Sequence, residues 1–559
     1  MKSISVLTAL TLSLLTIACN EGTGKSSDIQ AVTLHQIKQL PKQTPSKQDQ
    51  TQFTPPVIVK DEEIKSENSP GDTEEDKMFN KVEIMNTEEY DNIIENKFLT
   101  ATENPLSTFS IDVDEAAYSN IRRYLQSGSL PPNGAVRIEE MINYFDYNYP
   151  KPLNDDPFTI NTEMADCPWN EKHKLVHIGL QGKEIPIENL PAANLVFLID
   201  VSGSMESENK LPLVKASLGM LVDQLRADDK VAIAVYAGNA GLVLPSVSGA
   251  NKTKIKEAIA NLEAGGSTAG GDGIKLAYKI AKDNFIKGGN NRIILATDGD
   301  FNVGVSSDDE LVRLIEEERK SGVFLSILGY GIGNYKDSKM QQLADKGNGN
   351  HSYIDNINEA RKVLVSEFGS TLFTIAKDVK IQIEFNPAKA QAYRLIGYEN
   401  RILAAEDFNN DAKDAGELGS GHTVTALYEV IPIGVKNDFL PSIDSLKYQK
   451  VKAVPLPVSS TNEIMTIKLR YKNPAEDISK LIVHPVEDAK LSFDSTSDNF
   501  RFSAAVAEFG LLLRSSEFKQ QSSYPQVIAL AKSAKGKDEN GYRSEFIQLV
   551  QSATSLAVK

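Results

Sequence analysis

The sequence predicts an α/β domain with a doubly wound, mostly parallel sheet of the Rossmann-like kind, flanked by or inserted into a β-rich sandwich domain and followed by C-terminal helices. Three observations support this. Strands and helices alternate over 191–376, and the strands are continuous apolar runs such as NLVFLID and VFLSILGYG, as expected when helices cover both faces of a parallel sheet. Alternating patterns such as DVKIQIEFN fill 377–491 and indicate antiparallel strands. The segment 492–559 has helical spacing.

The first residues have the pattern of a secretory signal. MKSISVLTALTLSLLTIACN has a lysine, an apolar run and small Ala18 before Cys19. This resembles the lipobox of bacterial lipoproteins, although Thr16 stands where that pattern usually has Leu. The resemblance implies a lipoprotein signal peptide over 1–19, a lipid on Cys19 and a membrane connection through that anchor. The alternative is an ordinary signal peptide with a chance cysteine.

The same resemblance implies a place in the bacterial cell envelope. Asn20 follows Cys19, and asparagine at this position permits the outer membrane in a Gram-negative cell, on its periplasmic or its surface face. Residues 20–85 are polar and then acidic, which predicts a disordered tether.

The rest of the chain divides by pattern. The predicted units are an N-terminal helix and strand region over 86–190, the α/β domain over 191–376, a β-rich domain over 377–491 and a helical region over 492–559. We further expect the strands of 158–190 to pair with those of 377–490, so that the α/β domain is an insertion in one sandwich.

Composition excludes several classes of function. The formal net charge is -16 and the pI is about 5.1, which argues against a nucleic-acid partner because such a protein needs a basic face. Two cysteines cannot build a disulfide framework or a cysteine-based zinc site.

Acids and hydroxyls follow the strands of the α/β domain at three places. The segments are DVSGS after the first strand, AGGSTAGG before a helix, and ILATDGD at the end of a later strand. Ligands of doubly wound sheets bind outside the carboxyl ends of the strands, so we expect these segments to meet. Two carboxylates with hydroxyls, and no Cys or His, suit a hard cation.

Together these segments resemble the metal-ion-dependent adhesion site of von Willebrand factor A domains. The resemblance implies a bound Mg²⁺, with Mn²⁺ or Ca²⁺ as alternatives, and assigns it the ligands Asp200, Ser202, Ser204, Thr268 and Asp298. It also implies a protein partner that supplies a carboxylate to the metal. Flanking segments such as FSIDVDEAAYSNIRRYL resemble those of bacterial von Willebrand factor A lipoproteins.

Three functions are compatible with this site. The first is metal-dependent adhesion or scaffolding, without enzymatic activity. The second is a structural envelope protein that the metal only stabilises. The third is metal-assisted hydrolysis, which lacks a base because the site motifs contain no His or Lys.

One weaker cation motif lies outside the α/β domain. In DFNNDAKDAGE, over 407–417, Asp407, Asn409 and Asp411 have the spacing that begins a calcium loop. Ala412 and Leu418 stand where that loop needs a glycine and a glutamate. A polar surface loop between strands is the better interpretation.

Overall fold

The computed structural model describes residues 87–153, 156–266, 270–299, 308–367, 373–440, 461–474, 476–489 and 491–557. Cys19, the signal segment 1–19 and the tether 20–85 lie outside the described residues, so the predictions made for them remain predictions. Among the described helices, none has the length and apolar character that a membrane span requires.

The α/β domain is built on a mixed sheet with the strand order β10-β9-β8-β5-β6-β7. All neighbouring strands are parallel except β6 and β7. The strands are β5 (Ala193–Asp200), β6 (Lys230–Tyr236), β7 (Ala240–Ser248), β8 (Asn290–Thr297), β9 (Val323–Tyr330) and β10 (His351–Ile354). The predicted doubly wound fold is confirmed.

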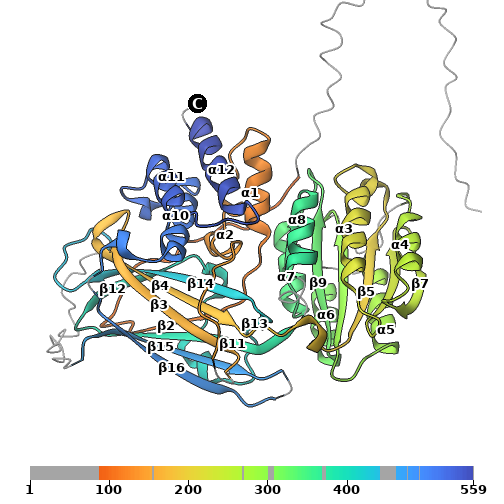
Figure 1. Cartoon of the computed structure of the whole chain (residues 1–559), viewed down its shortest axis with the longest axis horizontal. Coiled ribbons are helices and arrows are strands. Elements are labelled where there is room, and N and C mark those ends of the chain that lie inside the picture. Colours follow the sequence, from red (N-terminus) through yellow and green to blue (C-terminus); the bar gives the residue numbers. More distant parts are fainter. Residues whose placement is uncertain are drawn as a thin grey trace, which may run out of the picture. The chain divides into compact units, whose positions relative to one another are not determined.

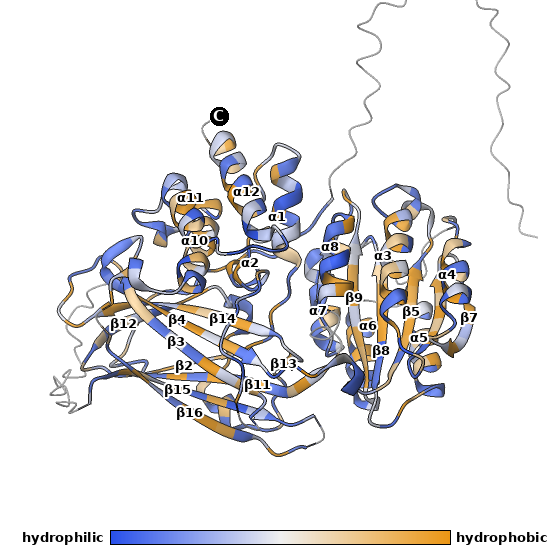
Figure 2. Ribbon diagram, viewed as in Figure 1, coloured by the Kyte–Doolittle hydropathy of each residue, from blue (hydrophilic) through white to orange (hydrophobic). Residues whose placement is uncertain are grey.

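Helices cover both faces of this sheet (Figure 1). One apolar core joins the sheet to α3, α4 and α8, and a second core joins it to α5, α6 and α7. The helices are α3 (Leu211–Gln224), α4 (Lys252–Ala260), α5 (Gly270–Asp283), α6 (Asp308–Glu318), α7 (Asp337–Lys346) and α8 (Ile357–Arg361), which continues as a π-helical turn (Lys362–Ser366). Figure 2 shows the matching hydropathy: the central strands are largely orange, whereas the helices carry both colours.

Two antiparallel sheets form a sandwich around a separate apolar core. The first has the order β1-β12-β14-β4-β3, and the second has the order β13-β11-β15-β16 with β2 also paired to β11. The first sheet contains β1 (Leu99–Thr100), β3 (Phe158–Cys167), β4 (Asn170–Gly182), β12 (Ala390–Ile396) and β14 (Thr423–Pro432). The second contains β2 (Leu106–Ser110), β11 (Thr374–Phe385), β13 (Gly416–Gly419), β15 (Glu463–Lys472) and β16 (Lys480–Glu487).

Strands from before and after the α/β domain pair directly in this sandwich. β4 runs antiparallel to β14, with Leu175 opposite Glu429 and Gln181 opposite Thr423. The α/β domain is therefore an insertion in one sandwich, as the sequence predicted.

A helical layer packs against the first sheet (Figure 1). Five helices form this layer, and their apolar side chains share one core with residues of β3 and β4. They are α1 (Ala116–Gln126), α2 (Ile138–Asn143), α10 (Asp498–Leu513), α11 (Tyr524–Ser533) and α12 (Tyr542–Ala557). The predicted C-terminal helices are confirmed, and two helices from the N-terminal side join them.

A carboxyl group buried in this layer predicts a pH dependence of stability. Glu508 of α10 is fully buried. Its Oε1 accepts a hydrogen bond from the Ser523 backbone N–H at 3.2 Å, and the Ser522 side chain also acts on the carboxyl group, which no described cation pairs with. Burial raises the pKa of Glu508 from about 4.5 to about 8. The folded protein thus retains a proton that the unfolded chain releases.

Glu508→Gln is therefore expected to remove a loss of stability that the wild type undergoes as the pH rises. Between roughly pH 4.5 and 8 the unfolding free energy of the wild type should fall relative to the variant by about 1.4 kcal/mol per pH unit, and stay level above that range. Urea unfolding of both proteins at several pH values measures the difference. A constant difference across this range would contradict the assignment.

Candidate functional site

The candidate site lies where the strand order of the α/β sheet reverses. β5 is the first strand of this sheet in the chain, and it lies between β6 on one side and β8 on the other. Asp200 is the last residue of β5, and Asp298 directly follows β8. Because β5 and β8 are parallel neighbours, both acids are placed at the same edge of the sheet, where doubly wound folds bind ligands.

Asp200 is fixed by its own loop and by the neighbouring strands. Its Oδ1 accepts a hydrogen bond from the Ser202 backbone N–H at 2.9 Å, and its Oδ2 accepts one from the Thr297 hydroxyl at 3.3 Å. Ser202 and Ser204, on the next turn, have their hydroxyl oxygens 3.0 Å apart. Asp200 and Ser202 are buried and Ser204 is exposed, so the group lies at the edge of the interior.

The second predicted loop packs against the first. The Gly203 N–H donates to the Gly266 carbonyl at 3.0 Å, and the Gly265 N–H donates to the Val201 carbonyl at 2.7 Å. Gly266 has a φ of +85°, a backbone conformation that favours glycine. Thr268, the ligand predicted on this loop, lies outside the described residues, and its assignment stays a prediction.

Asp298 has a cationic partner, and Asp200 does not have one in the described residues. The Lys210 ammonium lies 2.8 Å from Asp298 Oδ2, and the Asn334 side chain donates to the same oxygen at 3.3 Å. Burial raises the pKa of Asp200 to about 6, and the charge of Asp298 acts in the same direction, against hydrogen bonds from Ser202. The site therefore contains more buried negative charge than Lys210 alone compensates.

Lys210 is the charged site residue that the sequence did not predict. It precedes α3 and is itself buried, with 7% of its surface exposed. A Cβ at Gly331, whose φ is +80°, would lie 2.4 Å from Lys210 Cε, so the glycine leaves room for the lysine side chain. Lys210 lies only six residues after Ser204 and directly before α3. This closeness to the first motif in the sequence is the signal from which a lysine at the site could have been predicted.

The donor set fits a hard divalent cation. The described site groups are two carboxylates and two serine hydroxyls, all of them oxygen donors of the kind that Mg²⁺ and Ca²⁺ take. Among the described residues no group of three or more His, Cys, Asp or Glu side chains is placed to hold a metal ion. Cation binding at this edge would therefore depend on the serine hydroxyls as well as the acids.

Comparisons with known protein families match most of the chain. The family model for the von Willebrand factor type A domain matches residues 194–365, and a second von Willebrand factor model matches residues 84–177. The model described as "Uncharacterized protein YfbK, C-terminal" matches residues 370–556.

Individual relatives agree with these models. The "Uncharacterized protein YfbK" of Escherichia coli (strain K12) is 46% identical over 477 residues, covering 84% of this chain and 81% of that protein. The "Uncharacterized protein sll0103" of Synechocystis is 31% identical over 170 residues, 30% of this chain and 39% of that protein. Human inter-alpha-trypsin inhibitor heavy chain H4 is 30% identical over 147 residues, covering 25% of this chain and 16% of that protein.

Solved structures of other proteins are similar to parts of this chain. The von Willebrand factor type A protein from Catenulispora acidiphila has a TM-score of 0.38 at 15% identity, covering 80% of this chain and 90% of that one. The hypothetical protein BatB from Bacteroides thetaiotaomicron has a TM-score of 0.28 at 23% identity, covering 32% of this chain and 97% of that one.

Proposed function

Because the chain belongs to the YfbK family of bacterial von Willebrand factor type A domain proteins, we propose that it binds a partner protein through a divalent cation. Family membership suggests protein–protein interaction or adhesion. The proposed ligands are Asp200, Ser202, Ser204, Thr268 and Asp298, with Mg²⁺ as the ion. The observation that carries the proposal is the convergence of three loops at the carboxyl ends of β5 and β8.

The charges of the site support the proposal. Asp200 is fully buried, and among the described residues it accepts hydrogen bonds from Ser202, Thr297 and Tyr236 and pairs with no cation. An uncompensated buried carboxylate is costly, whereas a bound cation would neutralise it and offer an open position to a carboxylate from outside. The exposed Ser204 hydroxyl marks the side from which a partner would approach.

The proposed place of action is the bacterial cell envelope. A lipid on Cys19 would anchor the chain, and the acidic segment 20–85 would separate the folded part from the membrane surface. Asn20 favours the outer membrane if the cell is Gram-negative.

Partner binding can be tested by capture from envelope extract. With the full chain as bait, we expect a retained protein in Mg²⁺ that is released by EDTA and is not captured by the Asp298→Ala variant. Surface charge alone can retain proteins non-specifically. The matched control is therefore Asp272→Ala, which removes an exposed carboxylate of α5 instead of a proposed metal ligand. Capture that survives both chelation and the Asp298→Ala change would contradict the proposal.

Two other functions have weaker support. A metal that only stabilises the fold would raise the melting temperature without any partner. Hydrolysis would need a base, and Lys210, the additional basic group at the site, is engaged as a cation by Asp298. We therefore propose binding and no catalysis.

The ion pair of Lys210 gives a prediction about the metal-free protein. Lys210→Met leaves the buried Asp298 carboxylate without its cation, which should lower the unfolding free energy by about 3–5 kcal/mol. Added Mg²⁺ should restore much of this loss, because the ion supplies the missing charge. Urea unfolding with Mg²⁺ and with EDTA measures both effects.

Lys275→Met is the control, since Lys275 is exposed and lies 4.0 Å from Asp272. A pair of this kind contributes at most about 1 kcal/mol. A Lys210→Met variant that is destabilised equally with Mg²⁺ and with EDTA would contradict the expectation.

A further inference from the structure

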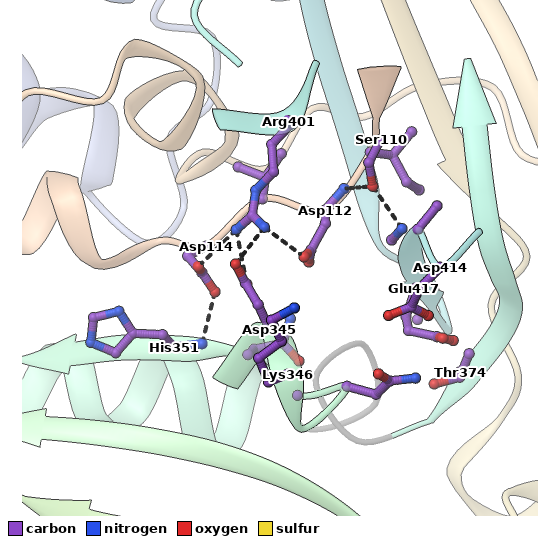
Figure 3. A pocket seen from close by; sticks show the side chains of 18 of the residues that line it. Ser110, Asp112, Asp114, Asp345, Lys346, His351, Thr374, Arg401, Asp414 and Glu417 are labelled. Carbon is purple, nitrogen blue, oxygen red and sulfur yellow. Dashed lines mark hydrogen bonds and ion pairs between the residues drawn. The ribbon is translucent and has the colours of Figure 1, made fainter. Parts of the chain in front are cut away.

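A polar cavity of about 490 Å³ lies at the end of the α/β sheet opposite to the candidate metal site. Arg292, near the start of β8, lines it, whereas Asp298 follows the end of the same strand. The other side of the cavity comes from the sandwich and includes Asp112, Arg401 and Glu417 (Figure 3). Nothing in the proposed function uses this cavity.

Most charged side chains of the cavity are in ion pairs. The Arg401 guanidinium contacts Asp345 at 2.7 Å, Asp112 at 3.0 Å and Asp114 at 3.2 Å, as Figure 3 shows. Arg319 forms an ion pair with Asp414 at 2.5 Å. The charges of these side chains are therefore compensated within the protein, and they require no ligand.

Arg292 is an exception. It is 2% exposed, and its Nη1 donates to the Ser326 hydroxyl at 2.7 Å. Its Nε has no partner, and no acid of the described residues forms an ion pair with it. The guanidinium lies 5.6 Å from the centre of the Phe324 ring, and the nearest acid to act on it is Glu417, which is not within ion-pair distance. A buried guanidinium without a direct ion pair is costly, which indicates that an acceptor is missing beside its Nε.

Glu417 is the complementary exception. Its side chain makes no hydrogen bond or ion pair with the described residues, although it lines the same cavity as Arg292. Burial raises its pKa well above the ordinary range, as do the charges of Asp378, Asp414 and Asp112, and Arg292 acts in the opposite direction. Glu417 therefore has no positively charged donor within ion-pair distance, and Arg292 acts on it only from further away.

We propose that the cavity binds a small zwitterion, an amino acid or dipeptide, with its carboxylate on Arg292 and its ammonium group at Glu417. The volume lies within the range of small-molecule pockets. A metal cation alone would leave Arg292 without an acceptor. An anion alone would meet Glu417 and the acids around it.

The lining also argues against a sugar. Sugars are commonly held against aromatic faces, but the rings among the described lining residues are only those of His351 and His422, so the described walls offer no Trp, Tyr or Phe face for stacking. One cationic and one anionic side chain without direct partners in the same cavity select for a ligand that carries both signs.

The test uses the full chain and a panel of the twenty amino acids and glycyl dipeptides, with Mg²⁺, Ca²⁺ and common hexoses as comparison probes. We expect at least one zwitterion to raise the melting temperature and to bind in calorimetry. Arg292→Met and Glu417→Gln should each weaken that binding by roughly 10-fold or more, because each removes a charge-assisted hydrogen bond.

Stability without ligand separates this role from a structural one. If Arg292 serves a ligand, Arg292→Met should be as stable as the wild type or more so, since an unpaired buried charge is removed. Lys413→Gln is the matched control, because Lys413 lines the cavity and is paired with Asp407 at 3.5 Å; it should retain the binding.

Three results would overturn the proposal. One is a panel in which no zwitterion binds, the second is stabilisation by the cations or hexoses only, and the third is zwitterion binding that both Arg292→Met and Glu417→Gln retain.

Discussion

Replacing Asp200 with asparagine is expected to abolish Mg²⁺ binding without unfolding the protein. Asparagine keeps the shape and the oxygen that accepts the Ser202 N–H, and it removes a buried carboxyl group whose pKa is raised to about 6. The variant should therefore be at least as stable as the wild type without metal. Its affinity for Mg²⁺ should fall by more than about 100-fold, since even outer partners of metal ligands contribute 10- to 100-fold.

Calorimetric titration with Mg²⁺ measures this effect. Asp272→Asn is the matched control, because it makes the same chemical change at an exposed carboxylate of α5. It should bind Mg²⁺ like the wild type. An Asp200→Asn variant that retains wild-type affinity would show that the cation binds elsewhere.

The second large effect concerns the contact between the α/β domain and the helical layer. Arg122 of α1 forms ion pairs with Asp355, with Glu359 at 2.7 Å and with Glu545 at 3.1 Å. The side chains of Asp355 and Glu359 are almost fully buried. Arg122→Met leaves both acids without their cation and should lower the unfolding free energy by about 3–5 kcal/mol.

Urea unfolding at neutral pH measures this loss, and the loss should shrink in acid. Burial raises the pKa of Asp355 even beside Arg122, so without the cation its carboxyl takes up a proton more readily and the uncompensated charge disappears as the pH falls. Lys320→Met, which removes an exposed pair with Glu317, should change stability by about 1 kcal/mol or less. A loss for Arg122→Met no larger than that of this control would contradict the account.

The sequence predicted those elements whose pattern is local. β5, β8 and β9 are apolar runs that end at or just before Asp, Gly or Ser. A strand of a parallel sheet needs such a continuous run when helices cover both faces of the sheet. β7 was not predicted. It contains Gly241 and Pro245 and exposes Leu242 and Val243, and it forms only because β6 offers an open edge, the place where a strand tolerates proline.

The site was predictable to the extent that its residues share motifs. The structure brings together Asp200, Ser202, Ser204 and Asp298, which the three motifs contain. Lys210 was missed because its contact with Asp298 bridges 88 positions in the chain. Arg292 belongs to no motif, Glu417 holds no ligand position in the segment 407–417, and only the folded chain places the two at one cavity.

The central claim is that a divalent cation binds among these loops, and crystals soaked in Mn²⁺ test it most directly. Anomalous diffraction locates the ion independently of activity or partner. The account predicts a peak within coordination distance, about 2.0–2.4 Å, of Asp200 or Asp298 together with the Ser202 and Ser204 hydroxyls, and its absence in Asp200→Asn crystals. No peak at this edge of the sheet, or a peak only at another place, would contradict the account.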